Sequence, residues 1–134
     1  TVVYARELSM PAILDGIRAG HVFIDTEGSR DRVLELGGEA DGAKASMGDA
    51  LRVPANGTAS FDVHVAHAKG ASLAVLLDGK PFAPAVAAQV DTDDLHRKFS
   101  WNSDGKAHWL RVEVRDAAGK ALLAGNPIYL NPTR

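Results

Sequence analysis

The sequence has 134 residues, enough for one ordinary domain whose hydrophobic core needs neither disulfides nor a structural metal. Hydrophobic residues make up 46% and charged residues 24%, a globular composition that argues against disordered, fibrous and membrane-embedded classes. The 15 basic residues are scattered among 17 acidic ones, with a net charge of -2, so the sequence predicts no nucleic-acid partner. Cysteine is absent, which excludes disulfides and thiolate zinc sites but leaves cytoplasmic and exported locations both open.

The longest apolar run, residues 83–90, is interrupted by Pro84 and Gln89 and is far too short to cross a bilayer. We therefore expect a soluble domain with no membrane partner. The sequence opens without an initiator methionine or a signal-peptide pattern, so we expect it to be part of a longer protein.

One short helix is expected near the start of the chain. Ser9 is a good N-cap, and Leu8 and Ile13 have the spacing of a hydrophobic staple. Gly20 stands where a C′ glycine would end the helix, which predicts a helix over about residues 9–19.

The apolar residues Ile13, Leu14 and Ile17 share one face of this helix, so we expect that face to pack against something. His21 directly follows the helix and is expected to bond its C-terminal carbonyls.

After Gly20 the pattern changes to short apolar stretches separated by turn residues, as in an all-β domain. The strands expected from these patterns are 21–24, 33–36, 61–65, 72–77 and 110–115. The turn pairs are Asp41-Gly42, Asn56-Gly57, Asp78-Gly79 and Asp104-Gly105, followed by the turn at 116–119. We predict a mainly β fold: an antiparallel two-sheet, immunoglobulin-like sandwich with one short N-terminal helix. A compositional seam near residues 25–31 divides it into a boundary segment, 1–24, and a sandwich, 25–134.

The acidic segment 91–96 is the most suggestive chemical cluster, because carboxylates and imidazole together suit a divalent ion. It lacks the glycine and the distal glutamate of an EF-hand loop, so we interpret it as a solvated turn between two strands. A rival hypothesis is a small enzyme or metal sensor built on Asp93, Asp94 and His96 with a distant histidine.

Two other histidines lie three apart on a predicted strand. His64 and His67 project to opposite faces, so we expect no zinc site shared between them, with His64 facing solvent and His67 at the strand end. His108 has Asp104 nearby but no matched nucleophile, so no catalytic triad is predicted. We therefore expect no catalytic residue, metal ligand or cofactor within this sequence.

Two tryptophans and an arginine form the predicted ligand or partner surface. Trp101 and Trp109 can stack on a sugar or anchor a protein contact, and Trp109 is expected to share a strand face with Arg111 and Glu113. Docking onto a neighbouring domain is the favoured interpretation, and an independent carbohydrate- or protein-binding module is the alternative.

Several segments together resemble a known family, and the resemblance covers nearly the whole chain. They are "VYARELS" at 3–9, "ILDGIRAGHV" at 13–22, "MGD" at 47–49, "LRVEVRD" at 110–116 and "NPIY" at 126–129. They are similar to the C-terminal region of bacterial metallohydrolases of the polymerase and histidinol phosphatase superfamily, in its carbaryl-hydrolase-like branch. In that region a helix and a β-sandwich follow a metal-binding catalytic domain.

The resemblance implies a non-catalytic accessory domain of a metal-dependent hydrolase, a phosphoesterase, with a role in domain packing, stability or substrate access. Its partner would be its own N-terminal catalytic domain, which would carry the divalent metal. The family's His-x-His motif has no counterpart here, so no metal ligand is carried over. The residues expected at the interdomain boundary are Leu8, Ile13, Leu14 and Ile17.

Overall fold

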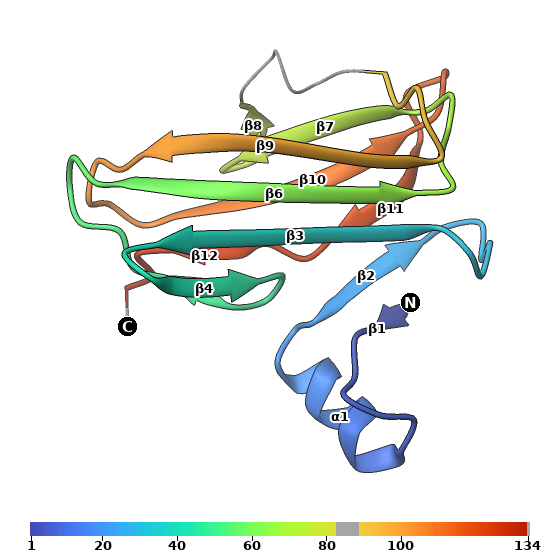
Figure 1. The fold of residues 1–134 in the computed structure, drawn as a ribbon, viewed down its shortest axis with the longest axis horizontal. Coiled ribbons are helices and arrows are strands. Elements are labelled where there is room, and N and C mark those ends of the chain that lie inside the picture. Colours follow the sequence, from blue (N-terminus) through green and yellow to red (C-terminus); the bar gives the residue numbers. More distant parts are fainter. Residues whose placement is uncertain (83–88, 134) are drawn as a thin grey trace.

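Two β-sheets lie face to face and one short helix stands outside them (Figure 1). This arrangement is seen in a computed structural model that describes residues 1–82 and 89–133, so most of the apolar run at 83–90 falls outside the described residues. The predicted mainly β, two-sheet sandwich with a short N-terminal helix is confirmed. The immunoglobulin-like assignment stays a prediction. Within the described residues, no helix is long and apolar enough to span a membrane.

The larger sheet is built around β10, which pairs with three other strands. Its order is β1-β2-β11-β10-β12-β5, with β7 on the other edge of β10 and β8 beyond β7. All of its pairs are antiparallel except β12 with β5. Its strands are β1 (Val2–Val3), β2 (Val22–Asp25), β5 (Ala50–Leu51), β7 (Ser72–Leu77), β8 (Lys80–Pro81), β10 (His108–Arg115), β11 (Ala121–Gly125) and β12 (Ile128–Leu130).

The smaller sheet has the order β4-β3-β6-β9 and is antiparallel throughout. Its strands are β3 (Val33–Ala40), β4 (Ala43–Ser46), β6 (Thr58–Ala66) and β9 (Asp94–Asn102). Strand β9 includes Asp94 and His96, which were expected in a solvated turn. The inward positions of β9 are Leu95, Arg97, Phe99 and Trp101, so Arg97 interrupts the period-two apolar pattern that would indicate this strand.

Two tight hairpins follow the predicted turn chemistry. Asp41 and Gly42 join β3 to β4 with φ of 49° and 79°, and Asp78 and Gly79 join β7 to β8 with φ of 52° and 82°. Two consecutive residues with positive φ match the right-handed twist of the flanking strands. The Asp-Gly pairs therefore set the register of both hairpins.

The core lies between the two sheets. On β6, Phe61, Val63 and Val65 are at most 1% exposed, which confirms the predicted alternation. They pack with the inward residues of β10, namely Leu110, Val112 and Val114. Gly38 on β3 leaves room for Phe61, since a Cβ at residue 38 would lie 2.9 Å from a ring carbon of Phe61.

The helix α1 (Met10–Arg18) forms as predicted but packs through different residues. The Ser9 hydroxyl accepts a hydrogen bond from the Ala12 N–H, which confirms the N-cap. Leu8 is 96% exposed, so the predicted staple with Ile13 is wrong. The buried residues of α1 are Ala12 and Gly16, whose small size lets the helix approach the chain at β1 closely.

The C-terminal end of α1 closes in a Schellman motif. Gly20 has φ of 76° and donates its N–H to the Ile17 carbonyl, and the His21 N–H bonds the Gly16 carbonyl. Gly20 therefore ends the helix as the sequence predicts.

The N-terminal segment is tied to the sandwich. Strand β1 pairs with β2 and β2 pairs with β11, so the predicted division after residue 24 falls inside a strand of the larger sheet. The Tyr4 hydroxyl also donates to the Leu34 carbonyl across to the smaller sheet at 2.9 Å. The helix α1, by contrast, projects away from the two sheets in Figure 1.

Candidate functional site

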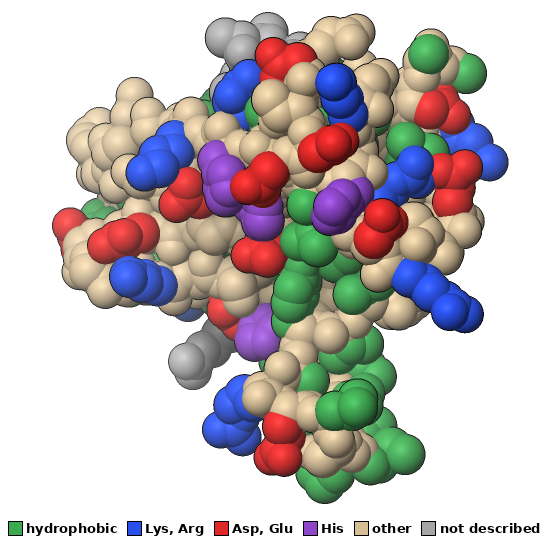
Figure 2. Space-filling view, turned by 45° about the vertical axis from the view of Figure 1, so that its right-hand side comes forward, with side chains coloured by type: hydrophobic (Ala, Val, Ile, Leu, Met, Phe, Trp, Pro, Cys, Tyr) green, Lys and Arg blue, Asp and Glu red, His purple; other side chains and the backbone are tan. Residues whose placement is uncertain are grey.

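The projecting helix carries exposed apolar side chains. Leu8, Met10, Leu14 and Ile17 are 96%, 69%, 38% and 50% exposed, and we call these four residues the helix surface. Figure 2 shows hydrophobic side chains gathered on the projecting part of the molecule. The predicted stripe therefore turns away from the sandwich, and only Ile13 of that stripe is half-buried. Exposed apolar surface of this kind is a feature of protein, membrane and ligand contact sites.

The two tryptophans do not form a shared ligand surface. Trp101 faces inward from β9 and is 5% exposed, so its predicted surface role is corrected. Trp109 and Arg111 do share the outer face of β10, and the Arg111 guanidinium lies 5.8 Å from the centre of the Trp109 ring. The arginine thus covers part of the face on which a sugar would stack.

Arg111 also helps to bury a carboxylate. Glu113 is 8% exposed and forms ion pairs with Arg111 and with Arg115, the latter at 2.8 Å. Burial disfavours the charged form, but the hydrogen bonds and charges of the two arginines outweigh it and hold the pKa of Glu113 below its ordinary value. The two arginines on this outward row of β10 therefore compensate the charge of the buried Glu113 carboxylate.

His108 bridges two aspartates. Its Nδ1 lies 2.5 Å from the Asp78 carboxylate, and its Nε2 lies 3.0 Å from both oxygens of Asp104. The hydrogen bond to Asp78, followed by that to Asp104, raises the pKa of His108 above its ordinary value. With both nitrogens donating to carboxylates, the ring has no lone pair free to act as a general base.

His21 bonds a helix carbonyl, that of Gly16, through its backbone N–H, and its side chain does not cap the helix. Its Nε2 lies 2.9 Å from the Asp49 carboxylate, while the Gly20 carbonyl accepts instead from the Asn126 side-chain amide. Partial burial works against ionisation of Asp49, but hydrogen bonds from His21 and Ser46 outweigh it and keep the pKa of Asp49 below its ordinary value. The sequence does not predict the pair of His21 and Asp49, because the two residues come together only in the folded chain.

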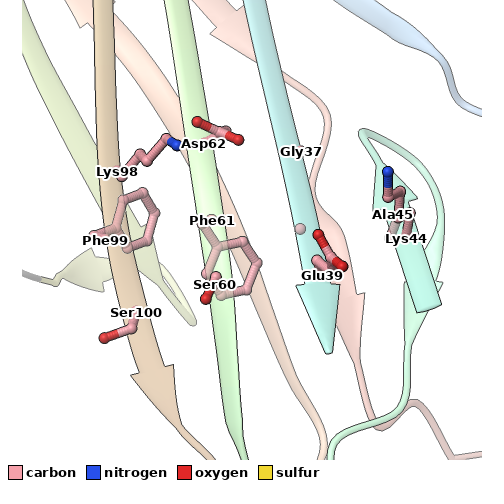
Figure 3. A pocket seen from close by; sticks show the side chains of 11 residues that line it. Gly37, Glu39, Lys44, Ala45, Ser60, Phe61, Asp62, Lys98, Phe99 and Ser100 are labelled. Atoms are coloured by element: carbon pink, nitrogen blue, oxygen red, sulfur yellow. The ribbon is translucent and has the colours of Figure 1, made fainter. Parts of the chain in front are cut away.

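The outer face of the smaller sheet is hollowed where β3 has no side chain. Gly37 lies in register with Asp62 of β6, which in turn lies in register with Lys98 of β9. A groove of about 580 Å³ opens there, and Asp62 and Lys98 point toward one another across it (Figure 3). Its lining mixes polar and apolar side chains and carries both signs of charge, which does not favour a purely apolar ligand.

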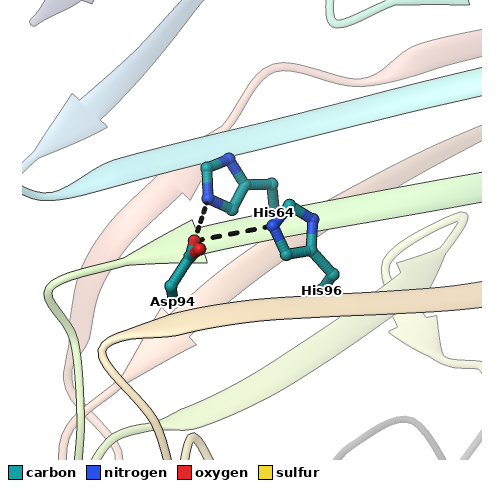
Figure 4. Close-up of side chains that lie close together, drawn as sticks. All are labelled: His64, Asp94 and His96. Carbon is teal, nitrogen blue, oxygen red and sulfur yellow. Dashed lines mark hydrogen bonds and ion pairs between the residues drawn. The ribbon is translucent and has the colours of Figure 1, made fainter.

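A cluster of two imidazoles and a carboxylate lies beside this groove, at the next outward-facing pair of positions on β6 and β9. His64 of β6 and His96 of β9 are direct cross-strand partners, and their rings stack 4.3 Å apart at an angle of 4°. Asp94 sends one carboxylate oxygen to within 2.6 Å of the His64 Nε2 and 3.5 Å of the His96 Nε2 (Figure 4). We call His64, Asp94 and His96 the histidine–aspartate cluster.

Charged groups around this cluster affect its histidine and aspartate side chains. Glu35 of β3 places a carboxylate oxygen 3.7 Å from the His64 Nδ1. The hydrogen bond from His64, helped by the charges of nearby imidazoles, holds the pKa of Asp94 below its ordinary value. The carboxylate of Asp94 is therefore ionised at neutral pH.

Sequence reasoning found parts of this cluster but not the whole. It correctly put His64 on the solvent face and His67 at the strand end, where φ is 60°. It considered Asp94 and His96 with a distant histidine, and the folded chain shows that His64 is that neighbour. Asp93 is not one of the three residues of the cluster, and its backbone carbonyl accepts a hydrogen bond from the His67 N–H.

No protein-family model matches the chain, and no curated protein matches it either. The fold and its surfaces define the chain as a two-sheet β-sandwich with an attached, partly apolar helix.

Proposed function

We propose that this chain is a non-catalytic accessory domain that docks through its helix surface onto a catalytic domain of the same polypeptide. The observation that carries the proposal is the exposure of Leu14 and Ile17 on a helix that is itself well capped and firmly attached. A marginal helix end would expose apolar groups by fraying, whereas this one holds them in place.

The geometry of attachment supports this role. Helix α1 contacts the sandwich through Ala12 and Gly16, so its larger side chains are left for another surface. Covering them would remove apolar area from water, at about 25 cal/mol per Å². The helix surface would thus join two domains while the sandwich keeps a core of its own.

The identity of the partner comes from the family resemblance. It implies a catalytic domain of a metal-dependent hydrolase, a phosphoesterase, next to the helix, with its divalent metal held in that domain. The proposed contributions of this chain are domain packing, stability and substrate access.

The ionisable groups of the chain favour a supporting role. His108 and His21 are both engaged by aspartates, and Glu113 is engaged by two arginines. A binding module centred on Trp109 is less favoured, because Arg111 lies over its ring.

The test compares amide hydrogen exchange of residues 10–18 in the isolated chain and in the complete polypeptide that the gene encodes. We expect slower exchange in the complete polypeptide, because docking protects the helix. The double variant Leu14→Asp/Ile17→Asp should abolish that extra protection while leaving the isolated sandwich folded.

Ile24→Asp is the matched control, since Ile24 is 50% exposed like Ile17 but lies on β2. It should leave the protection of the helix unchanged. Equal exchange of residues 10–18 in the isolated chain and the complete polypeptide would overturn the proposal.

A further inference from the structure

The histidine–aspartate cluster is fixed by sheet register rather than by flexible loops. His64 and His96 occupy paired positions on neighbouring strands, and Asp94 lies two residues from His96 on the same face. Cross-strand partners on one face hold their Cβ atoms about 5 Å apart. The backbone thus brings two imidazoles and a carboxylate to one place before any ligand binds.

The donor atoms of the cluster converge. One ligand atom from each of His64, Asp94 and His96 lies within 4.8 Å of the other two. A tetrahedral zinc ion with bonds of about 2.0–2.1 Å separates its ligands by about 3.3 Å. Small side-chain rotations that open the 2.6 Å contact between His64 and Asp94 would admit such an ion.

Glu35 is placed to orient one ligand. It faces the Nδ1 of His64, while the Nε2 of the same ring faces Asp94. A metal would have to displace the proton through which Nε2 bonds Asp94, and a carboxylate beside Nδ1 favours the ring form that keeps its proton there, as around most metal-bound histidines. Glu35 would act as a positioning residue.

From this convergence we propose that His64, Asp94 and His96 form a binding site for a divalent transition-metal ion of the zinc type. Two imidazole nitrogens and one carboxylate oxygen form a donor set that suits zinc and its neighbours. The side chains of Asp94 and His96 are 69% and 63% exposed, so water can fill the remaining coordination positions. The proposal is independent of docking by the helix surface, and it is opposite to the sequence-based expectation of no metal in this chain.

The experiment is a calorimetric titration of the chelator-treated chain with zinc chloride at pH 7.5. We expect one zinc per chain, a rise in thermal midpoint on saturation, and no heat with magnesium, which prefers oxygen ligands. His64→Ala and His96→Ala should each weaken zinc binding at least about tenfold. Because His96 is exposed, the His96→Ala variant should keep the wild-type thermal midpoint without metal.

His21→Gln is the matched control, since it removes an imidazole that faces Asp49 instead. It should bind zinc within twofold of the wild-type affinity. Glu35→Gln should weaken binding by about tenfold and shift the ring-nitrogen resonances of His64, a change that a purely structural role would not produce. Absence of stoichiometric zinc binding, or equal affinity in the wild type and in His64→Ala/His96→Ala, would overturn the proposal.

Discussion

His108 joins two connections of the chain through one imidazole ring. Asp78 lies in the turn between β7 and β8, and Asp104 lies between β9 and β10, so the ring links a hairpin of the larger sheet to the crossover between the sheets. The same Asp78 carboxylate accepts the backbone N–H of Trp109. One side chain thus orders three segments.

The protonation of His108 gives this link a defined pH range. Hydrogen bonds to Asp78 and Asp104 raise the pKa of His108, so its contribution is complete below about pH 6.5 and is lost as pH rises through the folded-state pKa. The pKa of Asp104 is lowered, first by the Lys106 N–H and then by His108, so the contribution of this carboxylate is lost on acidification below about pH 4. The link is strongest between these limits.

Replacement of His108 by glutamine should therefore destabilise the chain more at pH 6 than at pH 9. We expect a loss of about 1 kcal/mol in the free energy of unfolding at pH 6, typical of a lost hydrogen bond. Urea unfolding at both pH values measures the difference. A loss of the same size at pH 6 and pH 9 would show that protonation of His108 does not matter.

For single residues, the sequence predicts interactions with neighbours along the chain but not contacts between residues far apart in the chain. Ser9 and Gly20 act as cap and terminator because each needs only its neighbours along the chain. His64 and His96 are 32 residues apart, and only the register of β6 against β9 makes them partners. That register depends on packing in the core, which no local pattern encodes.

At the scale of elements, the junction between α1 and the loop after β4 is unusually close. A Cβ on Gly48 would lie 2.4 Å from the Ala19 carbonyl oxygen, and Gly48 has φ of 93°. Asn126 reinforces the junction by donating to the Gly20 carbonyl. The position of the helix surface relative to the sandwich depends on this contact.

Gly48→Ala should consequently destabilise the chain more than Gly42→Ala. Both residues have positive φ, so each change costs about 1–2 kcal/mol in backbone strain. Gly42 has open space around its Cβ position, whereas Gly48 adds a backbone clash. Urea midpoints measure the two losses, and equal values would mean that the junction simply relaxes.

The apolar face of α1 points away from the sandwich, which the sequence does not predict. The periodicity of Ile13, Leu14 and Ile17 correctly predicts one apolar face, but it cannot say which face meets the sandwich. Close packing against β1 selected the face with Ala12 and Gly16, because only small residues fit there. Helix existence was therefore predictable, and helix orientation was not.

In the whole molecule, two adjacent glycines on β3 face opposite sides of the smaller sheet, and only Gly38 takes part in the packing of the core. Gly38 faces the core beneath Phe61, while Gly37 faces outward into the groove. Alanine substitutions at the two positions therefore distinguish an effect on core packing from an effect on strand propensity.

Gly38→Ala should destabilise the sandwich by about 1–3 kcal/mol through overpacking against Phe61. Gly37→Ala is the matched change, and its nearest contact is the Ala45 carbonyl oxygen at 3.9 Å. It should be neutral or stabilising by about 0.5–1 kcal/mol, because alanine loses less backbone entropy on folding. Thermal unfolding of the two variants ranks them, and a neutral Gly38→Ala would show that Phe61 can move aside.

Fold class was predictable at this scale because turn pairs and alternation recur along the chain. The pairing of β2 with β11 was not predictable, since the composition near residue 25 gives no sign of it; the division into 1–24 and 25–134 stays a prediction. Pairings between strands that lie far apart in the sequence form only as the chain folds, so local sequence patterns do not predict them.

The pairing of β2 with β11 also bears on how the chain is made. Residues 22–25 meet residues 121–125, so about 100 residues must be synthesised before β2 can gain this neighbour. At roughly 5–20 residues per second, that interval lasts roughly 5–20 s. During this time β2 is outside the ribosome well before β11, and one of its edges lacks the neighbour that it has in the folded chain.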